Sequence, residues 1–206
     1  MTGKPLNEKR FNDLKDGFLG RNKNKITEQQ IKENIIFSYC QTLEDYNKVF
    51  INLSQRIENE KIKLVIIDNI QSIGDNFIKT DGNVDFIERS NFLLKHSKNL
   101  KKLAYQFGLI IIILNNATSD INGNNGDPSR GFFQEKRNNV QPALGLLWSN
   151  CVNERICLKK KSMGGNHSNI DGQNVRRTIC IEKSSFLKRY ETEFELTMTG
   201  VKGKNV

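Results

Sequence analysis

Apolar and polar residues form blocks along the chain that have the lengths of buried strands and amphipathic helices. The runs 63–68 (KLVIID) and 109–114 (LIIIIL) are almost entirely apolar and rich in branched side chains, which predicts buried strands. The run 34–39 (NIIFSY) is predicted to be a strand for the same reason. Apolar residues recur at helical spacing over 43–57 and 86–107. This repeated β-α-β order predicts an α/β core with a parallel sheet.

Local signals mark the ends of the predicted helices. A first helix is predicted at 7–18, followed by a loop rich in Asn and Lys. Thr42 and Asp45 match a capping box and are expected to open the helix over 43–57. Gly108 follows the last apolar residue of the longest predicted helix and is expected to end it.

The second half of the chain has a different pattern. Residues 117–141 form a long segment rich in Asn and Gly, predicted to be a loop, and loops of this length are usually functional or disordered. A short helix is predicted at 142–152. Strands are predicted at 154–159, 175–181 and 191–197, and the short polar turns between them favour antiparallel pairing. The parallel core is therefore expected to continue into antiparallel strands.

Charge and cysteine content narrow the functional classes. The net charge of +9 favours polyanionic partners such as nucleic acid, although a solvated lysine-rich surface would give the same value. The 4 cysteines lie in apolar segments without a C-x-x-C pair, which favours reduced thiols in a nuclear or cytosolic protein. The N-terminus has no signal-peptide pattern and no apolar run is long enough to cross a bilayer, so no membrane partner is expected.

Polar side chains end both of the apolar strands. Asp68 closes the strand at 63–68, and Asn115 and Asn116 follow the strand at 109–114. Parallel strands place their carboxyl ends at one edge of the sheet, where ligands bind in open α/β folds. Asp68 at such an edge either holds Mg²⁺ directly or through water, or caps the next turn. The two amides either orient a water or phosphate, or bind loop backbone.

The long segment 117–141 also carries chemistry of its own. It combines cationic side chains with aromatic rings, which is the combination that sequence-tolerant binding of single strands uses. The alternative is that the rings pack inward and the cations are ordinary surface. The residues concerned are Arg130, Phe132, Phe133, Lys136 and Arg137.

The phosphate-binding string G-x-x-x-x-G-K-[ST] does not occur in this sequence. Five other segments, taken in order, resemble the RecA-type recombinase family and its eukaryotic strand-exchange paralogues. KLVIIDNIQSI resembles the second nucleotide motif, and ERSNFLLKHSKNLKKLAYQFGLIIIILNN resembles the helix and strand before the second DNA-binding loop. QPALGLLWSNCVNERICLKK, RRTICIEKS and FELTMTGVKG resemble the segments that follow, so the likeness runs from Thr2 to Gly203.

The resemblance implies a fold and a set of site residues. Residues 1–206 are expected to form a single partial RecA-like ATPase core, with a parallel sheet, helices on both faces and antiparallel C-terminal strands. The first strand, phosphate loop and first helix are expected to be missing, which would leave one side of the apolar sheet open. Asp68 is expected to support Mg²⁺ through water and Asn116 to stand at the γ-phosphate-sensing position. Residues 74–85 would be the first DNA-binding loop, with Arg89 near it, and residues 117–141 would be the second.

The implied function is DNA repair by homologous recombination, in the nucleus or cytoplasm. The chain would bind single-stranded DNA and assemble with another RecA-type subunit, and the family implies ATP and Mg²⁺ as cofactors. Whether the chain is an enzyme stays open, because the phosphate loop is absent and Gly3 stands where the family has a catalytic Glu. One alternative is a fragment of a complete DNA-dependent ATPase or strand-exchange protein. Another is a small-molecule, nucleotide-dependent α/β enzyme, which would not explain the segment PALGLLWSN.

Overall fold

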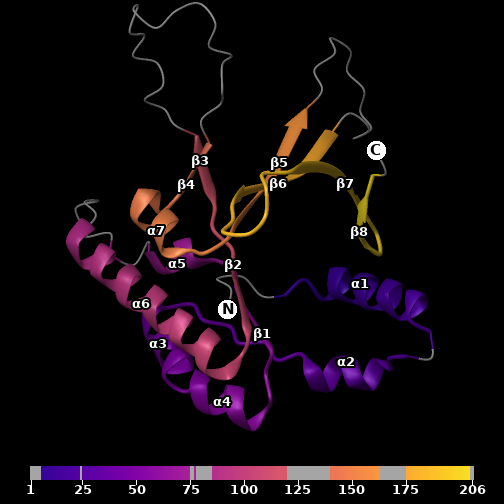
Figure 1. Ribbon diagram of the computed structural model, residues 1–206. Helices are drawn as coiled ribbons and strands as arrows, with labels where there is room; N and C mark the ends of the chain where they lie inside the picture. Colours follow the sequence, from indigo (N-terminus) through magenta and orange to yellow (C-terminus); the bar gives the residue numbers. More distant parts are fainter. Residues whose placement is uncertain are drawn as a thin grey trace, which may run out of the picture. The chain divides into compact units, whose positions relative to one another are not determined.

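The computed structural model describes residues 6–23, 25–74, 77, 85–119, 140–162 and 175–204. The chain divides into two compact units, whose elements can be followed in Figure 1. Unit 1 comprises Met1–Pro5 and Phe37–Cys151, and unit 2 comprises Leu6–Ile36 and Val152–Val206. Unit 1 contains a parallel pair of strands and unit 2 contains an antiparallel sheet.

The parallel pair of unit 1 has the predicted β-α-β connection. Strand β1 (Leu64–Ile67) pairs in parallel with β2 (Ile110–Ile113), so that Leu64 lies opposite Ile110 and Ile67 opposite Ile113. Helix α6 (Phe86–Phe107) precedes β2 in the chain and contacts β2 and α4 (Leu53–Asn59). The predicted parallel arrangement and the predicted bounds of the longest helix are confirmed.

The two faces of the parallel pair differ in exposure. Because successive side chains of a strand point to opposite faces, the buried Ile67 lies on one face and its neighbour Ile66 on the other. The second face is exposed in the described part of the chain. Its side chains and their exposed fractions are Leu64 47%, Ile66 49%, Ile110 66% and Ile112 46%.

Capping side chains set the helix ends of unit 1. The Thr42 hydroxyl accepts from the Asp45 N–H, and the Asp45 carboxylate accepts from the Thr42 N–H, which confirms the predicted capping box. The predicted helix over 43–57 is two helices, α3 (Leu43–Ile51) and α4, because the chain breaks at Asn52, whose side chain bonds the Lys48 carbonyl. Gly108 ends α6 with φ 58°, a left-handed conformation that suits glycine.

Short elements lie within both of the loops that were predicted in unit 1. Residues Ile70–Gly74 form a short helix, α5, so the loop predicted at 71–85 is wrong at its start. The segment 117–141 begins with β3 (Ala117–Ser119) and ends in β4 (Val140–Pro142), which pair antiparallel. Helix α7 (Gly145–Cys151) follows and contacts α6, with Trp148 buried. The long segment therefore begins and ends in two strands that pair with each other, although a loop was predicted over its whole length.

The strand predicted at 34–39 is wrong. Asn34 is the last residue of α2 (Glu28–Asn34), a helix that the sequence analysis missed. Ile35 follows in an extended conformation, but residues 35–40 form no strand, because the described residues supply no neighbouring strand to pair with them. Ile35, Phe37 and Tyr39 are consequently exposed. Apolar, β-branched composition was present, but a strand also requires a hydrogen-bonding partner.

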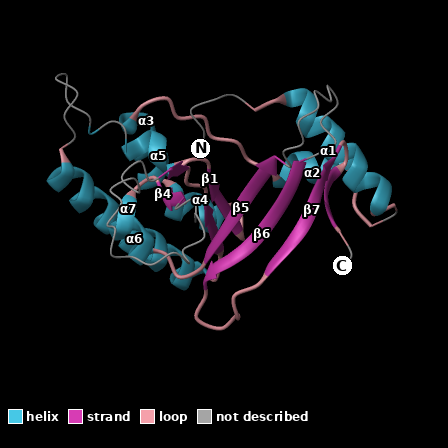
Figure 2. Cartoon of the chain, turned by 90° about the horizontal axis from the view of Figure 1, so that it is seen from above, coloured by secondary structure: helices cyan, strands magenta, loops and turns pink. Residues whose placement is uncertain are grey.

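Unit 2 is built on a four-stranded sheet in the order β5-β6-β7-β8. Its strands are β5 (Arg155–Ser162), β6 (Val175–Lys183), β7 (Glu191–Thr197) and β8 (Gly200–Gly203), and every pair is antiparallel. Figure 2 shows β5, β6 and β7 side by side. The predicted antiparallel pairing is confirmed, and β8 is an additional strand.

Helix α1 (Glu8–Arg21) packs against the β7–β8 turn within unit 2. The Arg10 guanidinium donates to the carbonyls of Thr197 and Met198. A Cβ added at Gly17 would lie 2.3 Å from the Thr199 Cβ, so the helix approaches the turn too closely for any larger residue. The helix was predicted to end at Phe18, but it continues to Arg21.

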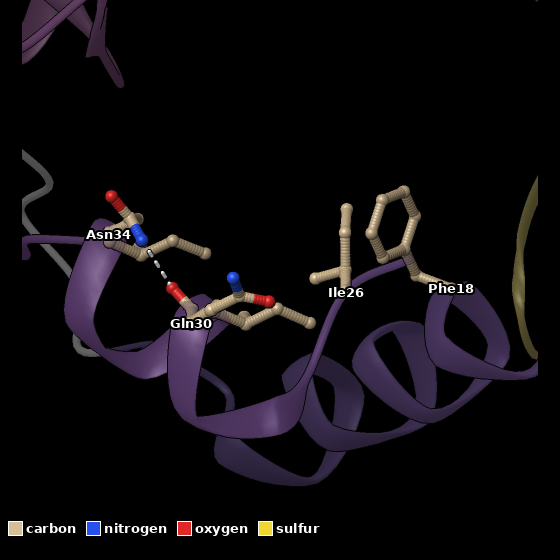
Figure 3. A pocket seen from close by; sticks show the side chains of 6 residues that line it. Phe18, Ile26, Gln30 and Asn34 are labelled. Atoms are coloured by element: carbon tan, nitrogen blue, oxygen red, sulfur yellow. Dashed lines mark hydrogen bonds between the residues drawn. The ribbon is translucent and has the colours of Figure 1, made fainter. Parts of the chain in front are cut away.

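A small apolar pocket lies beside α1 and α2 in unit 2 (Figure 3). Its volume is about 360 Å³. Phe18 and Ile26 lie at one end, and at the other the Asn34 amide donates to the Gln30 carbonyl at 2.7 Å. Ile31 and Ile35 complete the lining, which contains no titratable side chain.

Candidate functional site

The carboxyl edge of β1 and β2 brings together the polar residues predicted to meet there. The register continues past the strands, because the Leu114 N–H donates to the Ile67 carbonyl and the Ile70 N–H donates to the Leu114 carbonyl. Asp68 therefore leaves β1 beside the point where Asn115 and Asn116 leave β2. The Asp68 and Asn116 side chains are exposed at this edge.

Two buried polar groups at this edge have no partner among the described residues. Both the Oδ1 and the Nδ2 of Asn115 are buried without a hydrogen bond, and so is the Oε1 of Gln71 in α5. A buried amide without partners costs stability unless water or a ligand satisfies it. Asn69 is not part of this set, because its side chain accepts from the Ser72 N–H. The unsatisfied Asn115 amide marks the edge as a place where a polar ligand or water fits.

The donor set fits a hydrated Mg²⁺ better than a fully protein-coordinated one. Asp68 supplies one exposed carboxylate, and Mg²⁺ typically binds through one or two carboxylates while keeping several waters. Among the described residues no three His, Cys, Asp or Glu side chains are placed to hold a metal ion together. The edge therefore offers a carboxylate and amides for Mg²⁺ and phosphate oxygens. No glycine-rich cradle for phosphates occurs in the sequence.

Arg89 lies in the first turn of α6. Its guanidinium carbon is 5.5 Å from the centroid of the exposed Phe86 ring, a cation–π distance. The structure thus places the half-buried Arg89 beside the exposed Phe86 ring at the start of α6.

The five predicted DNA-binding residues of the long segment lie outside the described residues. What the structure describes is the base of that segment, where Ala117 pairs with Pro142 and Ser119 with Val140. The Ala143 N–H donates to the Asn116 carbonyl, which ties the base to the carboxyl edge. The residues whose roles stay predictions are Arg130, Phe132, Phe133, Lys136 and Arg137.

A buried histidine was not assigned any role from the sequence. His96 of α6 is 4% exposed and hydrogen-bonds the Tyr46 hydroxyl of α3 through its Nε2. Phe92 stacks on its ring and Phe50 lies 4.6 Å away, centroid to centroid. Burial lowers the pKa of His96 to about 4, so the ring is neutral, and its tautomer decides whether the tyrosine or the imidazole donates. The cluster joins α3 to α6 and has a structural role.

None of the described helices is both long enough and apolar enough to span a membrane. All four cysteines are free thiols, with Cys40, Cys151 and Cys180 buried and Cys157 partly so. Burial raises the pKa of Cys157 and Cys40, which keeps these thiols protonated.

Comparison with known families gives a match over most of the chain. The family model described as Rad51 matches residues 21–204. This range includes both parallel strands, the long helix between them and the whole antiparallel sheet. The carboxyl edge with Asp68 and Asn116 lies inside it.

Several curated proteins are similar in sequence. A "DNA repair protein XRCC3 homolog" from Arabidopsis thaliana is 27% identical over 155 residues, which cover 68% of this chain and 50% of that protein. A "DNA repair protein RAD51 homolog 2" from Mus musculus is 30% identical over 147 residues, 65% of this chain and 38% of that protein. A "Meiotic recombination protein DMC1 homolog A" from Oryza sativa subsp. indica is 22% identical over 83% of this chain and 43% of its own length. The chain thus matches half or less of each of these relatives.

Proposed function

The chain belongs to the Rad51 family, and from this premise we propose that it acts in DNA repair by homologous recombination. In this role it binds single-stranded DNA and assembles with another RecA-type subunit. The observation that carries the proposal is the family match over 21–204, in which the parallel strands, long helix and antiparallel sheet follow in order. The names of the similar proteins, all of DNA repair or recombination, support it. For this role we propose a location in the nucleus, with the cytoplasm as the alternative.

The carboxyl edge supports a nucleotide-linked role within that function. Asp68 would hold Mg²⁺ through water, and Asn116 would face the terminal phosphate of ATP from the neighbouring strand. When bound, Mg²⁺ would neutralise phosphate charge at this edge. The buried and unsatisfied Asn115 amide supports a polar occupant there. Because the sequence lacks the phosphate loop, we propose that a second RecA-type subunit completes the site.

The chain by itself should therefore not hydrolyse ATP measurably. Phosphoryl transfer depends on positioning and charge stabilisation by a phosphate cradle, which this sequence does not contain. The measurement is phosphate release from the purified protein with and without single-stranded DNA. DNA-stimulated release that disappears in Asp68→Ala would contradict the proposal of a shared site.

DNA binding by residues 117–141 is tested with a fluorescently labelled oligothymidylate. Three cations, Arg130, Lys136 and Arg137, would neutralise about three phosphates, so affinity should fall with log salt at a slope of about −2. Arg130→Ala with Arg137→Ala should flatten that slope. Phe132→Ala with Phe133→Ala should weaken binding and leave the slope unchanged, because stacking does not release counterions. If neither pair changes the affinity, this segment is not the DNA site.

A second candidate function follows from the partial coverage of the relatives. Since the chain spans half or less of each curated relative, it fits a portion of a complete DNA-dependent ATPase or strand-exchange protein. Genomic sequence upstream of the first codon discriminates the two. An in-frame G-x-x-x-x-G-K-[ST] motif would favour the complete ATPase, and its absence would favour the shared site.

A further inference from the structure

Two cysteines lie opposite each other in the antiparallel sheet of unit 2. Cys157 of β5 is the direct register partner of Cys180 of β6, and both are free thiols. Directly opposed residues of an antiparallel pair project their side chains to the same face of the sheet. Their Cα atoms lie about 4.5–5.5 Å apart, within the range of roughly 4.4–6.8 Å that a disulfide bond requires. The backbone therefore offers the spacing for a bond between the two sulfur atoms.

The two thiols differ in exposure. Cys180 is 1% exposed, whereas Cys157 is only partly buried, so a dissolved oxidant reaches Cys157 first. The Cys180 thiol donates to the Ile181 carbonyl at 3.7 Å. Burial above all raises the pKa of Cys157, the Glu182 carboxylate adds to the rise, and Cys180 itself contributes. Because a protonated thiol reacts slowly, the pair suits sustained exposure to an oxidant better than a brief signal.

The chemistry open to this pair is oxidation to a disulfide. Among the residues that the structure describes, no three His, Cys, Asp or Glu side chains are grouped so that they could hold a metal ion. A single thiol is oxidised to a sulfenic acid, which condenses with a second thiol when one is within reach. Two opposed thiols are therefore a reversible redox site, which a single buried cysteine is not.

We propose that Cys157 and Cys180 form a reversible disulfide that joins β5 to β6 when the chain meets hydrogen peroxide. The deprotonated Cys157 sulfur attacks one peroxide oxygen, the O–O bond breaks, and the leaving hydroxide takes up the thiol proton as water. The Cys180 sulfur then attacks the resulting sulfenic sulfur, the S–O bond breaks, and the second hydroxide leaves as water with the Cys180 proton. Two thiols thus lose two electrons, and one peroxide is reduced to two waters. The inference is independent of the proposed function in DNA repair.

The bond would act on a strand pair in which like charges oppose each other. Beyond the cysteine pair, Lys160 lies opposite Arg177 and Lys161 lies opposite Arg176. Like charges placed directly opposite each other destabilise an antiparallel pair. The ion pair of Arg176 with Glu193 offsets part of this repulsion. A covalent link between the cysteines would keep a separation of the strands at this end from spreading along the ladder.

Peptide mapping of the full chain tests the bond directly. The protein is treated with hydrogen peroxide, the remaining thiols are blocked, and tryptic peptides are identified by mass spectrometry without reduction. The cysteines fall in different tryptic peptides, with Cys157 in ICLK and Cys180 in TICIEK. The expected product is ICLK joined to TICIEK, in a chain that runs as a monomer on a non-reducing denaturing gel. If these two peptides are not joined, or are joined only between chains, the inference is wrong.

Substitutions separate the roles of the two thiols. Cys180→Ala leaves Cys157 without a partner, so peroxide should leave Cys157 as a sulfenic acid that dimedone labels. Cys157→Ser should leave Cys180 as an unreacted thiol, because its sulfur is shielded from solvent. Dimedone labelling of Cys180 in Cys157→Ser, with no labelling of Cys157 in Cys180→Ala, would overturn the order of the two steps.

A matched control removes the other two thiols. Cys40→Ala with Cys151→Ala changes two buried cysteines of unit 1 and leaves the pair in unit 2 intact. This variant should form the bond as fast as the unmodified chain. If it keeps the circular dichroism spectrum of the unmodified chain but no longer forms the bond, the direct reaction between Cys157 and Cys180 is wrong.

Hydrogen exchange measures what the bond does to the sheet. A disulfide closes a covalent loop between Cys157 and Cys180, which limits the unfolded states open to β5 and β6. Amide exchange in these strands should slow about ten-fold or more on oxidation, and exchange in β1 and β2 of unit 1 should change less than about two-fold. Dithiothreitol should reverse the slowing, and Cys180→Ala should abolish it. If the bond forms but exchange in β5 and β6 does not slow, it does not hold these strands together and the inference is overturned.

Discussion

The parallel pair of unit 1 and the antiparallel sheet of unit 2 reach stability in different ways. β1 and β2 contain only apolar side chains, and their order depends on packing one face against helices. The strands of unit 2 pair with their sequence neighbours, and ion pairs join glutamates of β7 to Arg176 of β6, to Lys159 of β5 and to Lys204, which follows β8. Unit 1 therefore depends on burial between distant segments, whereas much of unit 2 is fixed by local pairing.

The dependence of unit 1 on burial gives the largest expected effect. Ile67 and Ile66 are adjacent in β1 but point to opposite faces, and only Ile67 is buried. Ile67→Ala should lower the free energy of unfolding by about 2–5 kcal/mol, because it removes buried methyl groups and leaves a cavity. Ile66→Ala should cost about 1 kcal/mol or less and should reduce self-association through the open face.

Both variants are measured by urea unfolding, which is followed by the fluorescence of Trp148. This residue is the single tryptophan of the chain and is buried in unit 1. Size-exclusion chromatography with light scattering measures the association. Equal destabilisation by the two substitutions would show that the face of Ile66 is covered in solution. The proposed difference between the faces would then be wrong.

The buried histidine makes unit 1 sensitive to pH. Burial depresses the pKa of His96 from 6.5 to about 4, so between these values the unfolded chain binds a proton that the folded chain does not. The neutral His96 ring therefore contributes to the free energy of unfolding in full above about pH 6.5, and this contribution is lost as the pH falls towards about 4. The shift in pKa corresponds to a total of about 3 kcal/mol. Below about pH 4 this histidine should add no further loss.

Substitution isolates this effect from other titrations. His96→Gln retains a hydrogen-bonding group for the Tyr46 hydroxyl but does not titrate. The free energy of unfolding, measured by Trp148 fluorescence, should therefore depend less on pH between 6.5 and 4. The chain has 2 histidines, and His167→Gln serves as the control. A pH profile unchanged by His96→Gln would argue against a neutral buried ring.

Much of the fold could be predicted from the sequence where the determining signal is local. The spacing of apolar residues and Gly108 gave both ends of α6, and the Thr42 and Asp45 pattern gave the start of α3. The strand expected at 34–39 failed because composition does not reveal whether a partner strand is present. Helix α2 was missed although Thr27 and Gln30 form a capping box.

The candidate site follows the same division. Asp68 and Asn116 could be placed at one edge because parallel strands align their carboxyl ends. The unsatisfied Asn115 amide could not be identified, since it depends on what surrounds the side chain. The pairing of His96 with Tyr46 also could not be predicted, because the two residues lie on different helices and meet only after packing.

Close packing within unit 2 gives the next effect. Gly17→Ala places a methyl group against Thr199 and should destabilise unit 2 by about 1–3 kcal/mol through overpacking. Gly20 lies in the same helix with nothing within 4 Å of an added Cβ, so Gly20→Ala should stabilise by up to about 1 kcal/mol through helix propensity. Hydrogen exchange of α1 and β8 amides measures both variants. Equal protection in both would show that α1 does not pack on the β7–β8 turn as described.

The smallest expected effect comes from disrupting a capping box, either that of α2 in unit 2 or that of α3 in unit 1. Thr27 in unit 2 and Thr42 in unit 1 each accept from the N–H three residues later, so Thr27→Ala and Thr42→Ala should each cost about 1 kcal/mol of helix stability. The consequences should differ, because α3 buries Tyr46 while α2 buries no residue. Thr42→Ala should therefore lower the unfolding midpoint reported by Trp148. Thr27→Ala should only speed hydrogen exchange within α2.

Thr42→Ser and Thr27→Ser retain the capping hydroxyl and should restore both the unfolding midpoint and the exchange rate. If Thr27→Ala shifts the Trp148 midpoint as far as Thr42→Ala does, the two units unfold together and the contrast between them concerns architecture alone.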